Sequence, residues 1–110
     1  MNVKKLLSKF ISNPLDNRLT SSLISIAVSV SANGYIVDAE SVVTNSGYYP
    51  IALSGFNINN RNIRITQVMI MNYAKGSATV RYTLTNTTSS AISGAKLYVS
   101  IVWYKLGSIE

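Results

Sequence analysis

The sequence contains no cysteine and no histidine among its 110 residues. Without cysteine the chain forms no disulfide framework and has no thiolate nucleophile. Without histidine it lacks the commonest general base and the commonest transition-metal ligand. Side-chain carboxylates are also few: Asp16, Asp38, Glu40 and Glu110. Catalysis and metal binding therefore have few side chains to use, and we expect no cofactor.

Charged residues make up 13% of the chain, about half of the roughly 25% that is usual in soluble domains. Ser, Thr and Asn together account for 35 of the 110 residues, so neutral hydrogen-bonding side chains solvate the surface. This composition is typical of β-rich folds with Ser and Thr on their outer faces, and unlike that of disordered chains. The length predicts a single domain.

The net charge of +6 comes from ten Lys and Arg residues that are scattered along the chain. Phosphate binding needs a contiguous basic stripe, usually with aromatic residues interleaved. We therefore interpret the charge as a generally basic surface and do not expect nucleic-acid binding. No apolar stretch is long enough to predict a transmembrane segment.

The first 14 residues hold the chain's only helical pattern, because apolar residues recur there at spacings of three and four. The Asn13–Pro14 step ends the pattern. A secretory signal is not expected, because Ser8 and Lys9 interrupt the apolar run and no small-residue cleavage site follows. The segment 1–14 is predicted to be an attachment or oligomerisation helix. Its apolar face consists of Val3, Leu6, Leu7, Phe10 and Ile11, and we expect Leu6, Leu7 and Phe10 to contact other subunits.

From residue 19 to 106, apolar and polar residues alternate with the period of two that is typical of β-strands. Asn33–Gly34 and residues 47–50 are turn signals. The alternation slips by one at Ser54–Gly55, which predicts a β-bulge or a strand corner. Trp103 falls in register with core positions. The pattern predicts six or seven strands in an antiparallel β-sandwich or jelly roll. The strand-like segments are 24–30, 35–43, 51–58, 62–73, 78–86 and 95–105.

Three of these segments, around Ile36, from Val68 to Met71 and from Tyr98 to Tyr104, carry apolar residues on both faces. The outer faces of a solitary sandwich should be polar. One short helix cannot cover three strands, so we expect a homo-oligomer, in particular a trimer. Val68, Ile70 and Val102 are the sheet residues predicted to lie at its interface.

Asp38 and Glu40 lie two residues apart on one predicted strand, which places both on one face roughly 6–7 Å apart. Such a pair could serve glycoside hydrolysis or bind calcium. No other acid lies near them in the sequence, so two solvated carboxylates are the simpler interpretation. We expect a non-enzymatic protein.

Tyrosines are the better candidates for a binding function, because a phenol ring stacks on sugars and packs at interfaces. We expect Tyr48 and Tyr49 at a turn and Tyr98 and Tyr104 opposite the core. The alternative for the Tyr48–Tyr49 pair is a corner anchor, with one ring packed inwards and its hydroxyl bound to backbone. Neutral hydrogen bonds to a glycan would come from Asn57, Asn59 and Asn60.

The turn Gly-Tyr-x-Pro-Ile followed by Ser-Gly-Phe-Asn resembles one found in small β-sandwich domains of tailed-bacteriophage virion proteins. These are the C-terminal head domains of tail-fibre and receptor-binding proteins. The later stretch ATVRYTLTNTTSSAISGAKLYVSIVWYK has a similar rhythm, and the resemblance covers about residues 20 to 105. It implies a trimer. The matching turn residues are Gly47, Tyr48, Pro50, Ile51, Gly55, Phe56 and Asn57.

The resemblance implies a viral protein of the virion, made in the host cytoplasm, that binds host surface glycan at a tail tip or fibre head. This chain lacks the long shaft that precedes such heads, so it is either a fragment or a small protein attached to other virion proteins through its N-terminal segment. The second hypothesis is a purely structural capsid-decoration, spike or connector protein. The third is a polysaccharide-active enzyme that uses Asp38 and Glu40.

Overall fold

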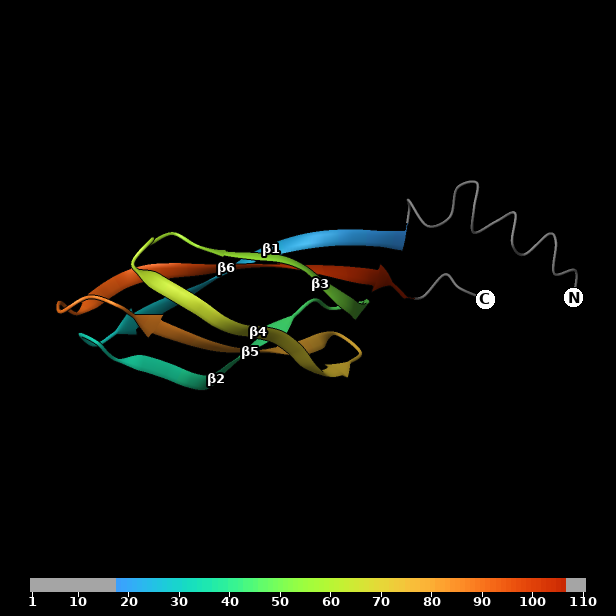
Figure 1. Cartoon of the computed structure of the whole chain (residues 1–110). Coiled ribbons are helices and arrows are strands. Elements are labelled where there is room, and N and C mark those ends of the chain that lie inside the picture. Colours follow the sequence, from blue (N-terminus) through green and yellow to red (C-terminus); the bar gives the residue numbers. More distant parts are fainter. Residues whose placement is uncertain (1–17, 107–110) are drawn as a thin grey trace, which may run out of the picture.

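The computed structural model describes residues 18–106, which form six β-strands in two facing sheets (Figure 1). The prediction of an all-β, antiparallel fold for this part of the chain is confirmed. The predicted N-terminal helix lies outside the described residues. The strands are β1 (Leu19–Val30), β2 (Tyr35–Thr44), β3 (Tyr48–Ile58), β4 (Ile63–Ala74), β5 (Ser77–Asn86) and β6 (Ile92–Lys105).

One sheet has the order β1-β6-β3 and the other β2-β5-β4, and all pairs are antiparallel. We name them the β6 sheet and the β5 sheet after their central strands. Only β4 and β5 are consecutive strands that pair with each other. The other four connections each cross from one sheet to the other (Figure 1). Apart from β4 and β5, the paired strands of each sheet therefore lie far apart in the sequence.

The core lies between the two central strands, because buried and less buried residues alternate along most of β6 and along β5 from Val80 onwards. Trp103, Leu97, Val99 and Ile101 of β6 are completely buried, as are Val80 and Leu84 of β5. The core position predicted for Trp103 is confirmed. Burying an aliphatic side chain of this size contributes about 1.5–3 kcal/mol, so these two strands supply much of the hydrophobic stabilisation.

β-Bulges interrupt the regular alternation on the edge strands. The slip predicted at Ser54–Gly55 is confirmed, since the pairing of β3 with β6 shifts between Leu53 and Gly55. A bulge that the sequence analysis missed lies between Ile65 and Gln67 of β4.

The β4 bulge corrects the predicted faces of two interface residues. The extra residue, Thr66, inverts the alternation, so Val68 and Ile70 lie on the same inner face as Ile63 and Ile65. The expectation that Val68 and Ile70 face outwards, opposite Ile63 and Ile65, is wrong. Ile70 belongs to the core, and Val68 packs against it.

The Asn33–Gly34 turn joins the two sheets and closes no hairpin. The Gly34 N–H donates to the Ser31 carbonyl at 2.9 Å, and Asn33 adopts a φ of 50°. A Cβ on Gly34 would lie 2.1 Å from Ser31 Oγ and 3.1 Å from the Ser31 carbonyl oxygen. The close approach to that carbonyl explains why glycine occupies this position.

Asn86, at the end of β5, is a buried polar side chain with 1% of its surface exposed. Its Nδ2 donates to the carbonyl oxygens of Val30, Ser31 and Ser90 at 3.2, 3.1 and 2.8 Å. Its Oδ1 accepts from the backbone N–H and the hydroxyl of Thr88. One neutral amide thus ties the end of β1 to the β5–β6 loop.

Candidate functional site

The candidate site is the outer face of the β6 sheet. Residues directly opposite each other in an antiparallel pair share a face. Tyr49 of β3 lies opposite Tyr104 of β6, and Asn57 lies opposite Tyr98. The inner face of β6 carries Trp103 and its buried neighbours, so these four side chains belong to the outer face. Four of the seven residues predicted to bind a ligand therefore share one surface.

Tyr48 is turned the other way. It is half-buried and packs against the core. Its backbone is fixed by the neighbouring turns, because its N–H donates to the Asn45 carbonyl and its carbonyl accepts from the Gly76 N–H at 2.7 Å. This is the inward-packed ring of the corner interpretation, and it leaves Tyr49 as the surface tyrosine of the pair.

Strand β1 completes the face. Residues that lie opposite each other on β1, β6 and β3 form rows across the three strands of this sheet. Four such rows on the outer face contain no charged side chain, and Lys96 lies in the row that follows them. Leu23 is 69% exposed and Ile51, in a bulge beside the second row, is 47% exposed. The surface therefore combines tyrosines, serines and exposed aliphatic side chains. The rows are Leu19–Tyr104–Tyr49, Ser21–Val102–Ala52, Leu23–Ser100–Gly55 and Ser25–Tyr98–Asn57.

Val102, the third predicted interface residue of the sheets, lies within this face and is half-buried. Near it, Ser54 donates a hydrogen bond to the Ser100 hydroxyl at 2.8 Å. The other predicted interface residues, Leu6, Leu7 and Phe10, lie outside the described residues.

The asparagines of the β3–β4 turn have structural roles. Asn59 Oδ1 accepts a hydrogen bond from the Lys96 N–H at 2.8 Å, which holds the turn against β6. Asn60 Oδ1 accepts from the Asn62 N–H at 2.9 Å, and Asn57 Oδ1 accepts from the Ile58 N–H at 2.8 Å. Asn59 and Asn60 lie beyond the end of β3, away from the Tyr49–Tyr104 row.

Asp38 and Glu40 lie on β2, in the other sheet. Glu40 Oε2 forms an ion pair with Arg81 of β5, at 2.6 Å from Nη2 and 3.2 Å from Nε. The hydrogen bond that Arg81 donates to Glu40 raises the pKa of Arg81, and the charge of Asp38 adds to this effect. Glu40 is thus a paired carboxylate on an exposed sheet face.

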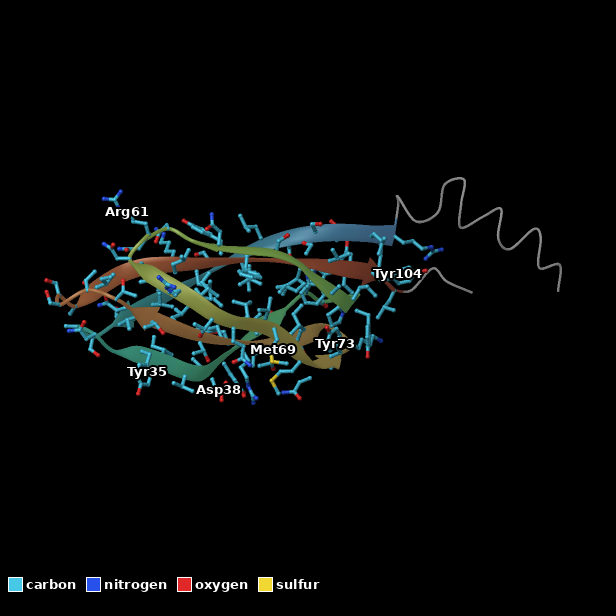
Figure 2. The ribbon with its side chains drawn as sticks, in the orientation of Figure 1. Tyr35, Asp38, Arg61, Met69, Tyr73 and Tyr104 are labelled. Carbon is cyan, nitrogen blue, oxygen red and sulfur yellow. The ribbon has the colours of Figure 1, made fainter. Side chains whose placement is uncertain are left out.

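Asp38 sits in a β-bulge with a φ of 52°, and its N–H donates to Thr83 Oγ1. Thr83 donates in turn to Gln67 Oε1. Figure 2 shows Asp38 and Met69 on the same outer side of the β5 sheet. In the part of the chain from 18 to 106, no three His, Cys, Asp or Glu side chains cluster closely enough to hold a metal ion.

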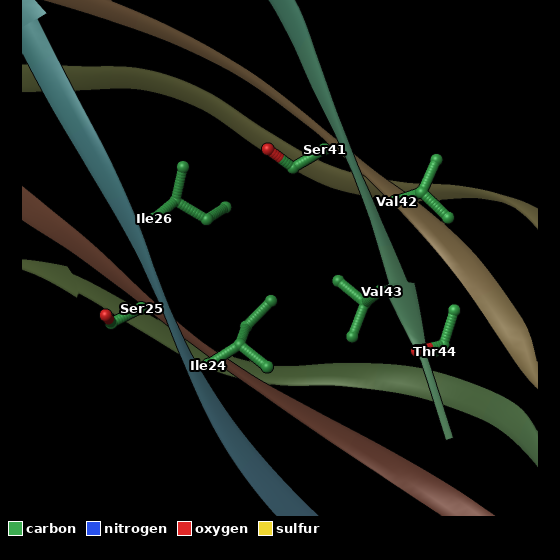
Figure 3. Close-up of a pocket in the computed structure, with 7 residues that line it drawn as sticks. All are labelled: Ile24, Ser25, Ile26, Ser41, Val42, Val43 and Thr44. Carbon is green, nitrogen blue, oxygen red and sulfur yellow. The ribbon is translucent and has the colours of Figure 1, made fainter. Parts of the chain in front are cut away.

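An open pocket lies at one lateral edge of the molecule, where β1 of one sheet faces β2 of the other (Figure 3). Its volume is about 400 Å³. Ile24 and Ile26 point from β1 towards Val43 of β2 across this gap. The pocket lining consists of Ile24, Ser25, Ile26, Ser41, Val42, Val43 and Thr44.

The aliphatic part of the candidate site was not predicted from the sequence. Leu19 and Leu23 occupy the alternate positions of β1 that face outwards, which they share with the polar residues Ser21 and Ser25. Their spacing of four was a usable signal, because period two then places both leucines on one outer face.

Comparison of the chain with protein-family models, with curated proteins and with solved structures finds no match. Within residues 18–106, no helix is long and apolar enough to cross a membrane. A functional assignment for this chain therefore has to come from the chemistry of its own faces.

Proposed function

We propose that this chain is a non-enzymatic adhesion module of a tailed-bacteriophage virion, which binds host surface glycan through the outer face of the β6 sheet. The observation that carries the binding proposal is the placement of Tyr49, Tyr98 and Tyr104 on one face whose four rows hold no charged side chain. The virion setting rests on the sequence resemblance at Gly47–Asn57. We assign the fold to the β-sandwich or jelly-roll class that this resemblance implies.

Tyrosine suits a carbohydrate ligand, because its ring covers the apolar face of a sugar while its hydroxyl can hydrogen-bond. Asn57 lies opposite Tyr98 and supplies an amide beside the ring. The Ser54–Ser100 hydroxyl pair adds neutral polar groups to the same surface. A neutral glycan loses little by binding to an uncharged face, whereas a charged ligand would lose its hydration without gaining an ion pair.

Affinity per site should be modest on an open sheet face, because a ligand there stays partly in water. Several copies of the face in one oligomer would raise the overall affinity through effective concentration. The proposal therefore includes a homo-oligomer presenting repeated weak sites.

The test is a glycan array and a host-cell adsorption assay with the assembled full-length protein. We expect Tyr98→Ala to weaken glycan binding by about tenfold, which corresponds to roughly 1.4 kcal/mol. Tyr35→Ala is the matched control, because Tyr35 is 67% exposed on the outer face of the other sheet. Absence of binding to any glycan and to host cells would overturn the adhesion function.

A purely structural role as a capsid-decoration, spike or connector protein is the second candidate. It is favoured by Leu19, Leu23 and Ile51, exposed aliphatic residues that cannot stack on sugars and are suited to protein contacts. For this role we expect Leu23→Ser to weaken association with other virion components while the array shows no binding. The third hypothesis, a polysaccharide-active enzyme, is not supported by Glu40, because this carboxylate forms an ion pair with Arg81. It would require a measurable hydrolytic activity that Asp38→Asn abolishes.

A further inference from the structure

Each of the two three-stranded sheets has two edge strands, and an exposed edge offers unpaired backbone groups to another chain. Proteins block such edges with bulges, charges and proline. Strand β2 carries a bulge at Asp38, whose φ is 52°, together with the charge of Glu40. Strand β3 contains Pro50 and two register shifts. Strand β4 contains Arg64 and two register shifts. Three of the four edges are therefore blocked.

Strand β1 lacks these features over most of its length. It pairs with β6 through ten consecutive residues without a register shift, from Leu19 opposite Tyr104 to Val28 opposite Ala95. The sequence from Leu19 to Ala32 contains no charged residue, no proline and no glycine. Within the described residues β1 pairs only with β6. It is a long, regular and uncharged edge, the kind that pairs readily with another strand.

The core is also open beside this edge. Ile24 and Ile26 lie on the inner face of β1 but are only half-buried, because the pocket between β1 and β2 adjoins them (Figure 3). On β2, Val42 is 71% exposed beside the same pocket. An occupant of this edge would therefore gain backbone hydrogen bonds and apolar contacts together.

We propose that the occupant is β1 of a second copy of this chain, paired antiparallel across a twofold axis at Ser25. Ser25 is the middle of the three β1 residues that line the pocket. In this register Ile24 lies opposite Ile26 of the partner subunit, and Leu23 lies opposite Ala27 of the partner subunit. The two β6 sheets join into one continuous sheet, and the two pockets face each other.

Self-pairing fits this strand better than it fits the rest of the surface. The chain carries a net charge of +6, which disfavours contacts between the charged parts of two copies. Strand β1 has no charge to repel its own copy, and next to the axis of the proposed register Ile24 meets Ile26 and Leu23 meets Ala27 of the partner subunit. A twofold axis produces an even-numbered assembly, in place of the trimer expected from the sequence.

The primary test is a cysteine cross-link, for which the cysteine-free chain is well suited. Opposing Cα atoms in an antiparallel pair lie about 4.5–5.5 Å apart, within the roughly 4.4–6.8 Å that disulfides span. Full-length Ser25→Cys should therefore form disulfide-linked dimers under mild oxidation. Asn57→Cys is the matched control and should not, because Ser25 and Asn57 flank Tyr98 from opposite edges of the same sheet. Equal cross-linking of the two variants, or none in either, would overturn the proposal.

Native mass spectrometry provides an independent measurement. We expect a wild-type dimer or a multiple of it, and a dissociation constant at least about tenfold weaker for Ser25→Lys, which places two like charges at the axis. Asn57→Lys should assemble as the wild type does, and circular dichroism should show both variants folded.

A wild-type monomer or trimer would overturn the proposal. So would a monomer that dimerises only after deletion of residues 1–17, since the chain's own N-terminal segment would then be the occupant. A monomer that still binds glycan would overturn only this inference.

Discussion

Ser22 of β1 accepts a 2.7 Å hydrogen bond at Oγ from the indole Nε1–H of Trp103 on β6. The two residues are diagonal neighbours on the inner face, because Ser22 pairs with Ile101 and Trp103 with Thr20. Trp103 is fully buried and Ser22 is half-buried, so the indole N–H depends on this side chain for its acceptor. Every buried side-chain nitrogen and oxygen in residues 18–106 has a hydrogen-bond partner, and at this site a neutral hydroxyl supplies it.

Ser22→Ala should lower the free energy of unfolding by about 1–3 kcal/mol, because it leaves a buried donor without a partner. Urea denaturation measures the change. Ser21→Ala, on the exposed outer face of the same strand, should shift stability by no more than about 0.5 kcal/mol. Equal effects from the two substitutions would contradict the role given to the indole hydrogen bond.

Asn86→Asp should destabilise the fold by at least about 3 kcal/mol at pH 7, since a carboxylate would replace the amide that donates to three carbonyl oxygens. Burial against these carbonyls favours the protonated acid, so the folded-state pKa of the introduced group should be raised. The loss relative to wild type should therefore be smallest below the unfolded pKa of about 3.9, where the protonated acid still supplies one donor, and should grow as the pH rises.

Thermal unfolding of Asn86→Asp at several pH values tests whether the loss of stability grows as the pH rises. Asn57→Asp is the control, because Asn57 is exposed and its Oδ1 already accepts a hydrogen bond that a carboxylate can also accept. A destabilisation that does not depend on pH would show that the buried amide is not the cause.

Thr83→Val should cost about 1–2 kcal/mol by removing the hydroxyl that joins the bulged strands β2 and β4. This hydroxyl accepts from the Asp38 N–H at 3.0 Å and donates to Gln67 at 3.1 Å. Thr85→Val, two residues further along the same face of β5, is the comparison. Hydrogen exchange should show faster exchange of the Asp38 amide in Thr83→Val alone.

Glu40→Gln should change stability little, although it removes the 2.6 Å ion pair between Glu40 and Arg81. Both side chains are partly exposed, and pairs of this kind contribute little in water. Any loss should disappear at about 1 M salt, where charges are screened over roughly 3 Å. A large, salt-independent loss in denaturation experiments would mean that the pair is structurally essential.

Strand positions followed closely from the sequence, because period two is a local property of each segment. The face on which each side chain lies could be predicted from the alternation only as far as the first bulge of a strand. At Thr66 one extra residue inverted the faces of Val68 and Ile70, and nothing in the local sequence marks it as Gly55 marks the β3 bulge.

Strand pairing is non-local, and the sequence could not provide it. Alternation placed Tyr98 and Tyr104 opposite the core, but their proximity to Tyr49 and Asn57 depends on β3 pairing with β6. The Asn33–Gly34 turn illustrates the same limit: its residues favour a tight turn, yet its flanking strands belong to different sheets.

The position of β6 has a consequence for biosynthesis. This strand is the centre of its sheet and also the last of the six described strands to be synthesised. While the ribosome is still translating residues 92–105, β1 and β3 have no partner between them, and their apolar faces are exposed in the nascent polypeptide. The β6 sheet can therefore assemble only after β6 has been synthesised, and a premature stop codon before β6 would leave an aggregation-prone product with this sheet unassembled.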